Sequence, residues 1–365
     1  MIDALFSPFD VRGLHLQSRF VMSPMSYYKN DGATPNDDFV EYHAARAGTA
    51  LGLTITGATA IDRVAANNHP NLAELTPRTL AAWRRVVDAV HAAGGPIAMQ
   101  LWHAGALFRI MPSHRPGPLE SPSGLVEPGD VVGAPMTDVE IVACVDAFAE
   151  AGRRARALGF DAVEIHAAHG FLIDEFFWEG TNRRTDRWGG ATLADRSAFA
   201  IEVVRAVRRA VGPDLPVFIR VSQWKEQDYG VKLAGTPAEL VAWIGPLVDA
   251  GADVVHCSQR RFWLPEFPDL DPELNLAGWV RRELGVPTIT VGSVGLDTDV
   301  MSFFDGAEAR SQPLDELARR FDRGDFDLVA VGRALLADPQ WVDHVRADRA
   351  ASGPIRLADL DLRVR

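Results

Sequence analysis

Cysteine and positive charge are both scarce in this chain. Its 365 residues include only two cysteines, Cys144 and Cys257. Two cysteines cannot form the disulfide framework of a small secreted scaffold, so we expect buried, reduced thiols in a cytoplasmic protein. Lysine and arginine number 37 against 49 aspartate and glutamate residues, which gives a net charge of −12. This balance argues against non-specific binding to nucleic acid or to an anionic membrane, because both need a basic surface.

Long apolar runs and a dinucleotide-binding fingerprint are also absent. No apolar segment approaches the roughly 20 residues that a membrane-spanning helix needs. Residues 1–8 lack the basic region followed by an apolar run that is typical of a signal peptide, so we expect a soluble, cytoplasmic protein. The pattern G-x-G-x-x-G does not occur, which argues against a doubly wound sheet of the Rossmann type.

What the chain does contain is the composition of a globular enzyme and a repeated pattern of helix ends and strand starts. Apolar residues make up 47% of the chain and charged residues 24%. Three segments share a glycine that ends a helix, an aspartate in the turn and then a buried strand: residues 158–163, 250–255 and 323–329. A threonine with a carboxylate three residues later predicts capping boxes, and Thr-Pro predicts a further helix start; these lie at Thr137, Thr236, more loosely Thr192, and Thr76.

Eight predicted strands alternate with helices, and this alternation predicts a (β/α)8 barrel. Several strands are near-continuous apolar runs, as expected for parallel strands covered on both faces. An open doubly wound sheet is the alternative fold. The strands are predicted at residues 19–24, 51–58, 96–102, 161–166, 216–222, 253–258, 287–292 and 326–332.

We expect a single domain over residues 1–365, with a core of about 5–345 and a C-terminal extension at 346–365. Residues 108–135 are rich in proline, glycine and serine, and they predict a long active-site loop or lid after the third strand. Residues 295–313 look like an insertion after the seventh strand.

The most informative stretch is the run 161–171. Asp161 to Ile165 predicts a short buried strand, and the chain then continues into His166, His169, Gly170 and Phe171. The carboxyl ends of barrel strands are where such folds carry their chemistry, so two imidazoles there predict an active site. The alternative is a pair of histidines that merely satisfy each other in the core.

Other strand ends carry groups suited to an anion and a planar ring. Glycines after the seventh and eighth strands let backbone N–H groups approach a phosphate, and an arginine supplies further donors. Tight turns without a ligand are the alternative for these residues, which are Gly292, Ser293, Gly332 and Arg333. Gln100 and Arg220 at ends of buried strands need partners, which the carbonyls and ring nitrogens of a flavin would supply.

Four stretches together resemble the old yellow enzyme family of FMN-dependent ene-reductases. They are residues 20–25 (FVMSPM), 100–103 (QLWH), 166–170 (HAAHG) and 182–190 (NRRTDRWGG), and the likeness covers about residues 5–339. The resemblance implies FMN across the barrel mouth and NADPH or NADH as hydride donor. It also implies that His166 and His169 hydrogen-bond the carbonyl of a small enone-like substrate and stabilise the enolate. FMN ring and ribityl contacts are implied for Pro24, Met25, Ser26, Ala58, Gln100 and Arg220, and phosphate contacts for Gly292, Ser293, Gly332 and Arg333.

The sequence departs from the family pattern at Phe171, where many members carry a tyrosine that protonates the α-carbon of the substrate. Reduction of the C=C bond of an α,β-unsaturated carbonyl is the expected activity, with the proton coming from water or from Tyr27 or Tyr28. Isomerisation or desaturation on the same flavin is the alternative. Ser26 stands where some members carry a flavin-tuning cysteine. Substrate contacts are expected from Tyr28, Trp102 and Trp263, and residues 223–225 and 260–263 are expected to add aromatic and cationic surface over the pocket.

Two readings from other classes stay open at this point. One is a metal-dependent barrel hydrolase that uses His166 and His169 with Glu164 or Asp174. The other is a non-catalytic flavin binder, in which Phe171 marks lost chemistry. The sequence does not decide whether the protein is a monomer or a homo-oligomer.

Overall fold

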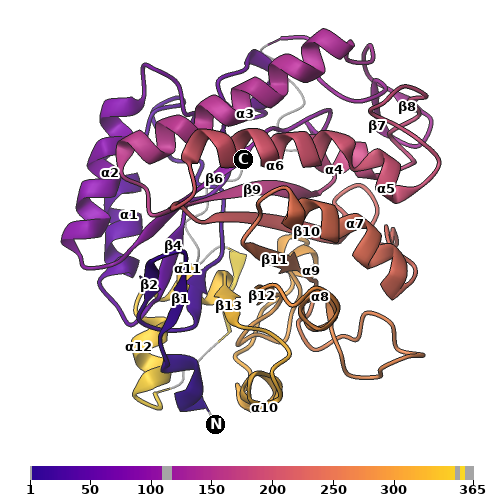
Figure 1. Cartoon of the computed structure of the whole chain (residues 1–365). Coiled ribbons are helices and arrows are strands. Elements are labelled where there is room, and N and C mark those ends of the chain that lie inside the picture. Colours follow the sequence, from indigo (N-terminus) through magenta and orange to yellow (C-terminus); the bar gives the residue numbers. More distant parts are fainter. Residues whose placement is uncertain (1, 109–116, 350–353, 358–365) are drawn as a thin grey trace.

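Eight parallel strands close into a barrel in the computed structural model, which describes residues 2–108, 117–349 and 354–357. Neighbouring strands pair in parallel all the way round, and a pairing between β4 and β6 closes the ring (Figure 1). The predicted (β/α)8 barrel is confirmed, and the open doubly wound sheet is wrong. The barrel strands are β3 (Phe20–Met22), β4 (Leu53–Ile55), β6 (Ile97–Trp102), β9 (Ala162–His169), β10 (Val217–Lys225), β11 (Val254–Ser258), β12 (Thr288–Val291) and β13 (Leu328–Val331).

Helices surround the barrel on its outside (Figure 1). Among the described residues none of them is long and apolar enough to cross a lipid bilayer. The helices are α1 (Asp37–Ala47), α2 (Leu80–Ala92), α3 (Asp138–Leu158), α4 (Leu172–Phe177), α5 (Leu193–Arg196), α6 (Ala198–Val211), α7 (Pro237–Asp249), α8 (Leu276–Leu284), α9 (Val300–Phe304), α10 (Asp315–Arg323), α11 (Arg333–Ala337) and α12 (Trp341–Arg346). Shorter elements are η1 (Ile2–Phe6), η2 (Val64–Ala66), β1 (Phe9–Val11), β2 (Leu14–Leu16), β5 (Thr59–Ala60), β7 (Leu125–Glu127) and β8 (Asp130–Val131).

Most of the predicted helix starts are confirmed. Thr137 and Thr192 both form complete capping boxes, so the sequence understated the second. Thr236 caps α7, but Glu239 accepts a hydrogen bond from Gly235 N at 2.7 Å instead of from the cap residue. The start at Thr76 is wrong: α2 begins at Leu80, because Thr79 rather than Thr76 is its N-cap residue.

The segments outside the minimal barrel have partly regular structure. Residues 109–116 of the predicted lid lie outside the described residues, and its remainder includes the antiparallel β7–β8 hairpin. The predicted insertion at 295–313 contains α9 and a bridge between Leu296 and Ser311. Ile355 pairs with Ala309, while residues 350–353 and 358–365 of the predicted C-terminal extension lie outside the described part.

The interior of the barrel is apolar where the strands begin and polar further along. The apolar floor includes Ala98, Ala162, Phe218 and Val254 from four adjacent strands, and the β1–β2 hairpin adds Leu16 to it. Alternate residues of a strand face the same side, so the residues two positions further along must also face the interior. These are Gln100, Glu164, Arg220 and His256, and they form a polar layer directly above the floor.

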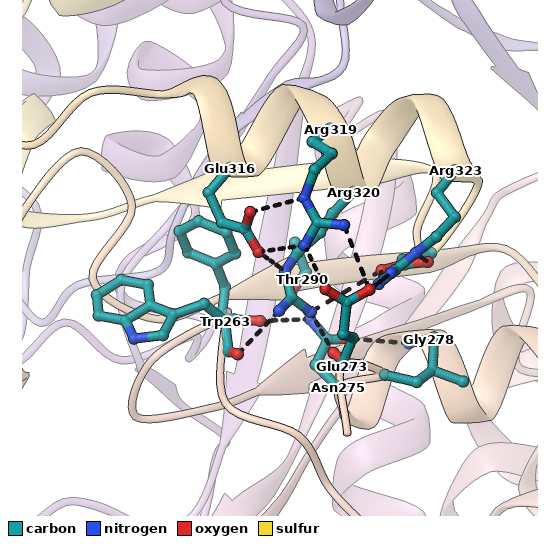
Figure 2. Close-up of polar contacts among 12 residues, drawn as sticks. Trp263, Glu273, Asn275, Gly278, Thr290, Glu316, Arg319, Arg320 and Arg323 are labelled. Atoms are coloured by element: carbon teal, nitrogen blue, oxygen red, sulfur yellow. Dashed lines mark hydrogen bonds and ion pairs between the residues drawn. The ribbon is translucent and has the colours of Figure 1, made fainter. Parts of the chain in front are cut away.

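The connection from β11 to α8 is tied to α10 by one buried arginine. Arg320 donates through Nη2 to the backbone oxygen of Trp263 at 3.0 Å and through Nη1 to that of Glu273. Its Nε lies 2.6 Å from a carboxylate oxygen of Glu316 (Figure 2). Asn275, at the end of the same connection, caps α8. The guanidinium therefore fixes the loop that carries Trp263.

We predict that Arg320→Ala lowers the free energy of unfolding by about 2–4 kcal/mol, because two partly buried carbonyl oxygens lose a charged donor. Urea denaturation followed by circular dichroism measures this. Arg319→Ala is the matched control: Arg319 is about half exposed and shares Glu273 and Glu316. We expect a loss below about 1 kcal/mol there. Equal losses in the two variants would contradict the role given to Arg320.

Candidate active site

The polar layer inside the barrel is centred on Glu164, whose side chain is fully buried. Its Oε2 accepts a hydrogen bond from Gln100 Nε2 at 2.6 Å, and its Oε1 lies 2.7 Å from His256 Nδ1. Burial opposes ionisation of Glu164, but His256, Arg220 and Gln100 outweigh burial and leave its pKa below the ordinary value. Burial lowers the pKa of His256, so a neutral imidazole donates to a carboxylate.

Two coupled imidazoles lie above this layer, at the carboxyl end of β9. His166 Nε2 is 3.2 Å from His169 Nδ1, and His169 Nε2 is 2.7 Å from Ser258 Oγ. Burial, followed by the charge of Arg220, lowers the pKa of both histidines well below the ordinary value. Both rings are therefore neutral at physiological pH. Trp224 stacks on His169, with ring centroids 4.5 Å apart.

The turn after β9 is held in an uncommon backbone conformation. His169 has φ = +67°, which a non-glycine residue adopts only when its surroundings enforce it. The next residue, Gly170, has φ = +84°, a backbone conformation that L side chains rarely adopt, so glycine is favoured there. Gly170 N donates to Asp174 Oδ2 at 2.6 Å, and Lys225 Nζ lies 2.6 and 2.8 Å from the two oxygens of Asp174.

This ion pair corrects one expectation from the sequence. Lys225 was expected on the surface over the pocket, but its side chain and that of Asp174 are fully buried. The reason is that β9 and β10 run on to His169 and Lys225, which pair with each other after a bulge. Gln223 is buried as well, whereas Trp224 lies against the site as expected.

The four residues of the predicted phosphate site lie together after β12 and β13. Arg333 donates to Asp299 O at 3.2 Å and to Ser293 Oγ at 3.4 Å. Burial lowers the pKa of Arg333 to about 10, so the guanidinium remains charged. A Cβ on Gly292 would lie 2.6 Å from Gln259 O, so no side chain fits there. A Cβ on Gly332 would lie 3.5 Å from Met25 Sδ, so this corner adjoins the end of β3.

The residues after β3 and β4 complete the mouth of the barrel. Arg220 Nη1 reaches Pro24 O at 3.5 Å, and Gly57 packs so closely on Met25 that a Cβ would lie 2.1 Å from its backbone oxygen. Ala58, which follows Gly57, is 9% exposed. The ring of Tyr28 packs at a tilt of 58° against that of His69, with centroids 4.6 Å apart. Burial raises the pKa of Tyr28 to about 12, although its hydrogen bond with Ser26 acts in the opposite direction.

The aromatic residues predicted to line the pocket have different surroundings. Trp102 is 2% exposed and packs edge-on against Phe171, with ring centroids 5.2 Å apart. Phe171 in turn packs edge-on against His166 at 5.1 Å. Trp263 instead packs against Phe262, and its backbone is bound by Arg320 (Figure 2). These contacts tie Trp263 to the β11–α8 connection and to α10.

Three contacts at this site were not predicted from the sequence. The hydrogen bond between Ser258 and His169, the ion pair of Asp174 with Lys225, and the Glu164–Gln100 contact all join residues distant in the chain. Only the alternation along the strands carried a signal, since it places polar residues two positions after apolar floor residues.

Comparisons with known proteins, by sequence and by structure, agree on one family. The family model described as the NADH:flavin oxidoreductase / NADH oxidase family matches residues 4–352. An NADPH dehydrogenase of Geobacillus thermodenitrificans is 34% identical over 347 residues, covering 93% of each chain. A chanoclavine-I aldehyde reductase of Penicillium roqueforti is 35% identical over 315 residues, covering 81% of this chain and 84% of its own. The solved structure of morphinone reductase superimposes with a TM-score of 0.78 at 27% identity, covering 98% of this chain and 92% of its own.

The chain belongs to the old yellow enzyme family. It is an NAD(P)H-dependent FMN oxidoreductase, as the sequence led us to expect. Its residues fit FMN, because buried donors at the strand ends have no hydrogen-bond partner within the described part of the chain and could bind the cofactor or the substrate. These are His166 Nδ1, Arg220 Nε and Trp102 Nε1.

The hypothesis of a metal-dependent hydrolase is wrong for this old yellow enzyme. The carboxylate of Asp174 is paired with Lys225, and that of Glu164 is hydrogen-bonded to Gln100 and His256. Neither carboxylate is therefore free to share a metal with the two histidines. Among the described residues, the cluster with metal-ligand spacing is instead His103, Glu120 and Cys144. Glu120 there already pairs with Arg63, which neutralises its charge.

We predict that Asp174→Asn lowers the free energy of unfolding by about 3–5 kcal/mol, because it leaves the ammonium of Lys225 buried without a counter-charge. Chemical denaturation of the holoenzyme measures the loss. Glu202→Gln, which breaks a half-exposed pair with Arg205, is the control and should change stability by less than about 1 kcal/mol. If Asp174→Asn lowered the free energy of unfolding by no more than Glu202→Gln does, the ion pair would not hold the turn.

The lowered pKa of His169 predicts a pH effect on stability. The unfolded chain binds a proton at this histidine below about pH 6.5, but the folded site does not, so acid favours unfolding. His169→Asn should therefore flatten the fall in unfolding free energy between pH 6.5 and 5 by about 1 kcal/mol per pH unit. Ser258→Ala removes the partner of His169 without removing the titrating ring, and should keep the wild-type slope. An unchanged slope in His169→Asn would mean that the folded site protonates normally.

Proposed function

We propose that this enzyme reduces the C=C bond of an α,β-unsaturated carbonyl compound, with NADPH or NADH as the source of hydride. The observation that carries the proposal is the pair of neutral imidazoles at the carboxyl end of β9, His166 and His169, whose ring nitrogens lie 3.2 Å apart and which are 5% and 7% exposed. The bound FMN would supply the hydride chemistry that links the nicotinamide to the β-carbon of the substrate.

The imidazoles would bind the carbonyl oxygen. Neutral rings can donate N–H groups without bringing a full charge into the site, and such donors stabilise the negative charge that develops on the oxygen. His169 is oriented by Ser258 and Trp224, and its backbone is fixed by the turn at Gly170. His166 Nδ1 has no partner within the described part of the chain and would bind the oxygen directly, whereas His169 would exchange its contact with His166 or Ser258 for the oxygen. Both rings are held in position before the substrate arrives, which is the condition under which donors lower the barrier most.

The cofactor contacts are part of the same proposal. Gln100 and Arg220 would hold the ring, since both project into the barrel and Arg220 makes only long hydrogen bonds of 3.3 and 3.5 Å within the protein. Backbone around the end of β3 and Ala58 would flank the ring and ribityl chain. The phosphate would lie at the corner of Gly292, Ser293, Gly332 and Arg333. For the substrate, Trp102 and Tyr28 have the surroundings of pocket residues, and Trp263 does not.

Phe171 leaves the proposed reaction without a proton donor at the position of the family's tyrosine. Its ring packs between Trp102 and His166 and offers no proton to the α-carbon. Tyr28, half-buried and bonded to Ser26 at the end of β3, is the nearest alternative donor that we propose. Isomerisation is the second candidate function, because an enolate that is not protonated can rotate about its Cα–Cβ single bond and then return the hydride, which regenerates the C=C bond in the other configuration.

We predict that Phe171→Tyr speeds reoxidation of the reduced enzyme by 2-cyclohexenone, because a general acid typically contributes about 10²–10⁴-fold. Anaerobic stopped-flow absorbance of the flavin measures the rate. Tyr28→Phe should slow the wild-type reaction and leave the Phe171→Tyr variant nearly unaffected. Fast and equal rates in wild type and Phe171→Tyr would show that another acid already serves. No reoxidation in either would remove enones as the substrate class.

A further inference from the structure

We propose that Glu164 is a positioning residue for the flavin: its carboxylate orients the amide of Gln100 and offsets part of the charge of Arg220, and thereby sets the reduction potential of the bound ring. The inference rests on the proposed placement of FMN against Gln100 and Arg220. It assigns a role to a buried ion that touches neither cofactor nor substrate.

The hydrogen bonds of Glu164 leave only one arrangement of the Gln100 amide. An ionised carboxylate accepts hydrogen bonds and cannot donate them, so the group of Gln100 that faces it must be the NH2. The short distance of 2.6 Å between Gln100 Nε2 and Glu164 Oε2 fits a charge-assisted bond. The other oxygen is taken by His256 Nδ1 at 2.7 Å, which stops the carboxylate from turning away. Gln100 then has one N–H and its carbonyl oxygen to present to a ring above it.

The charge of Glu164 acts over a longer range. Arg220 is buried, and no ion pair within the described part of the chain joins its guanidinium directly to a carboxylate. Glu164 belongs to the same polar layer, and its attraction raises the pKa of Arg220 against the lowering effect of burial. The cation is therefore offset but not neutralised. Reduction of a flavin adds negative charge to the ring, so a buried cation favours the reduced form and a buried anion opposes it.

A purely structural role would make a different prediction. If Glu164 served only to fill the barrel and bind His256, its replacement would change stability while the balance between oxidised and reduced flavin stayed the same. The reduction potential of the bound FMN distinguishes the two roles, because it reports only the difference in affinity for the two redox states.

The first experiment measures the midpoint potential of bound FMN in Glu164→Gln. Loss of the negative charge should favour reduced over oxidised FMN by at least about tenfold, which corresponds to a rise of about 30 mV for this two-electron couple. Glu175→Gln is the matched control. Glu175 is equally buried, but it lies on α4, accepts a hydrogen bond from Ala106 N and contacts neither Gln100 nor Arg220 in the described hydrogen bonds. We expect its potential to stay at that of the wild type. A potential in Glu164→Gln no higher than in Glu175→Gln overturns the proposal.

The second experiment does not require Glu164→Gln to fold. Glu164→Asp keeps the charge but withdraws it from Gln100, so it should weaken FMN binding through the loss of that contact. If Glu164 acts through Gln100, the double variant Glu164→Asp/Gln100→Ala binds FMN as weakly as Gln100→Ala alone. Losses that add up in the double variant, measured by fluorescence titration of the apoprotein with FMN, overturn the positioning role.

Arg220→Met separates this inference from the placement on which it rests. If FMN lies against Arg220, this variant lowers the midpoint potential, whatever Glu164 does. A shift with Arg220→Met but none with Glu164→Gln would therefore leave the cofactor placement intact and remove only the inference. No shift with either would mean that the ring lies elsewhere.

Discussion

The buried ion pair between Lys225 and Asp174 is the constraint on which the site depends. Asp174 binds the backbone of Gly170, and Lys225 is the residue of β10 that pairs with His169. The pair therefore joins the ends of two barrel strands at the point where one turns back into α4. The clamp holds the turn in which His169 adopts its left-handed conformation, which is uncommon for a residue other than glycine. The imidazole keeps its place because its neighbours leave the backbone no alternative.

The same logic explains why much of the fold was predictable from the sequence. Local signals of helix stop, turn and apolar strand repeat along the chain, and each is decided by residues close to one another. Thr137 and Thr192 cap their helices through contacts three residues away, and all eight barrel strands were found. Thr76 failed because the competing cap, Thr79, lies only three residues further on and binds the backbone of Thr76.

What escaped prediction depends on register between distant strands. The sequence shows Lys225 as a charge near a strand end, and nothing local says that it turns inward to meet an aspartate 51 residues earlier. Glu164 was likewise considered as a metal ligand, because its partners Gln100 and His256 come from other strands. Once the barrel is closed, alternation alone brings all three into one layer. The chemistry of the site is thus a property of the closed sheet, and the catalytic histidines are its visible part in the sequence.

The surroundings of the histidines also bear on why Phe171 matters. Burial and the nearby cation of Arg220 hold both imidazoles neutral, which suits them to donate hydrogen bonds to a carbonyl oxygen. A neutral imidazole that gave up its N–H proton would become an imidazolate anion. A buried site stabilises such an anion poorly unless a cation such as Arg220 lies close to it. In the proposed reaction the pair would therefore hold an enolate but would be a poor source of the proton that completes reduction. With phenylalanine at position 171, binding of the carbonyl and protonation of the carbon would become separate tasks. The supply of that proton would then decide between reduction and return of the hydride.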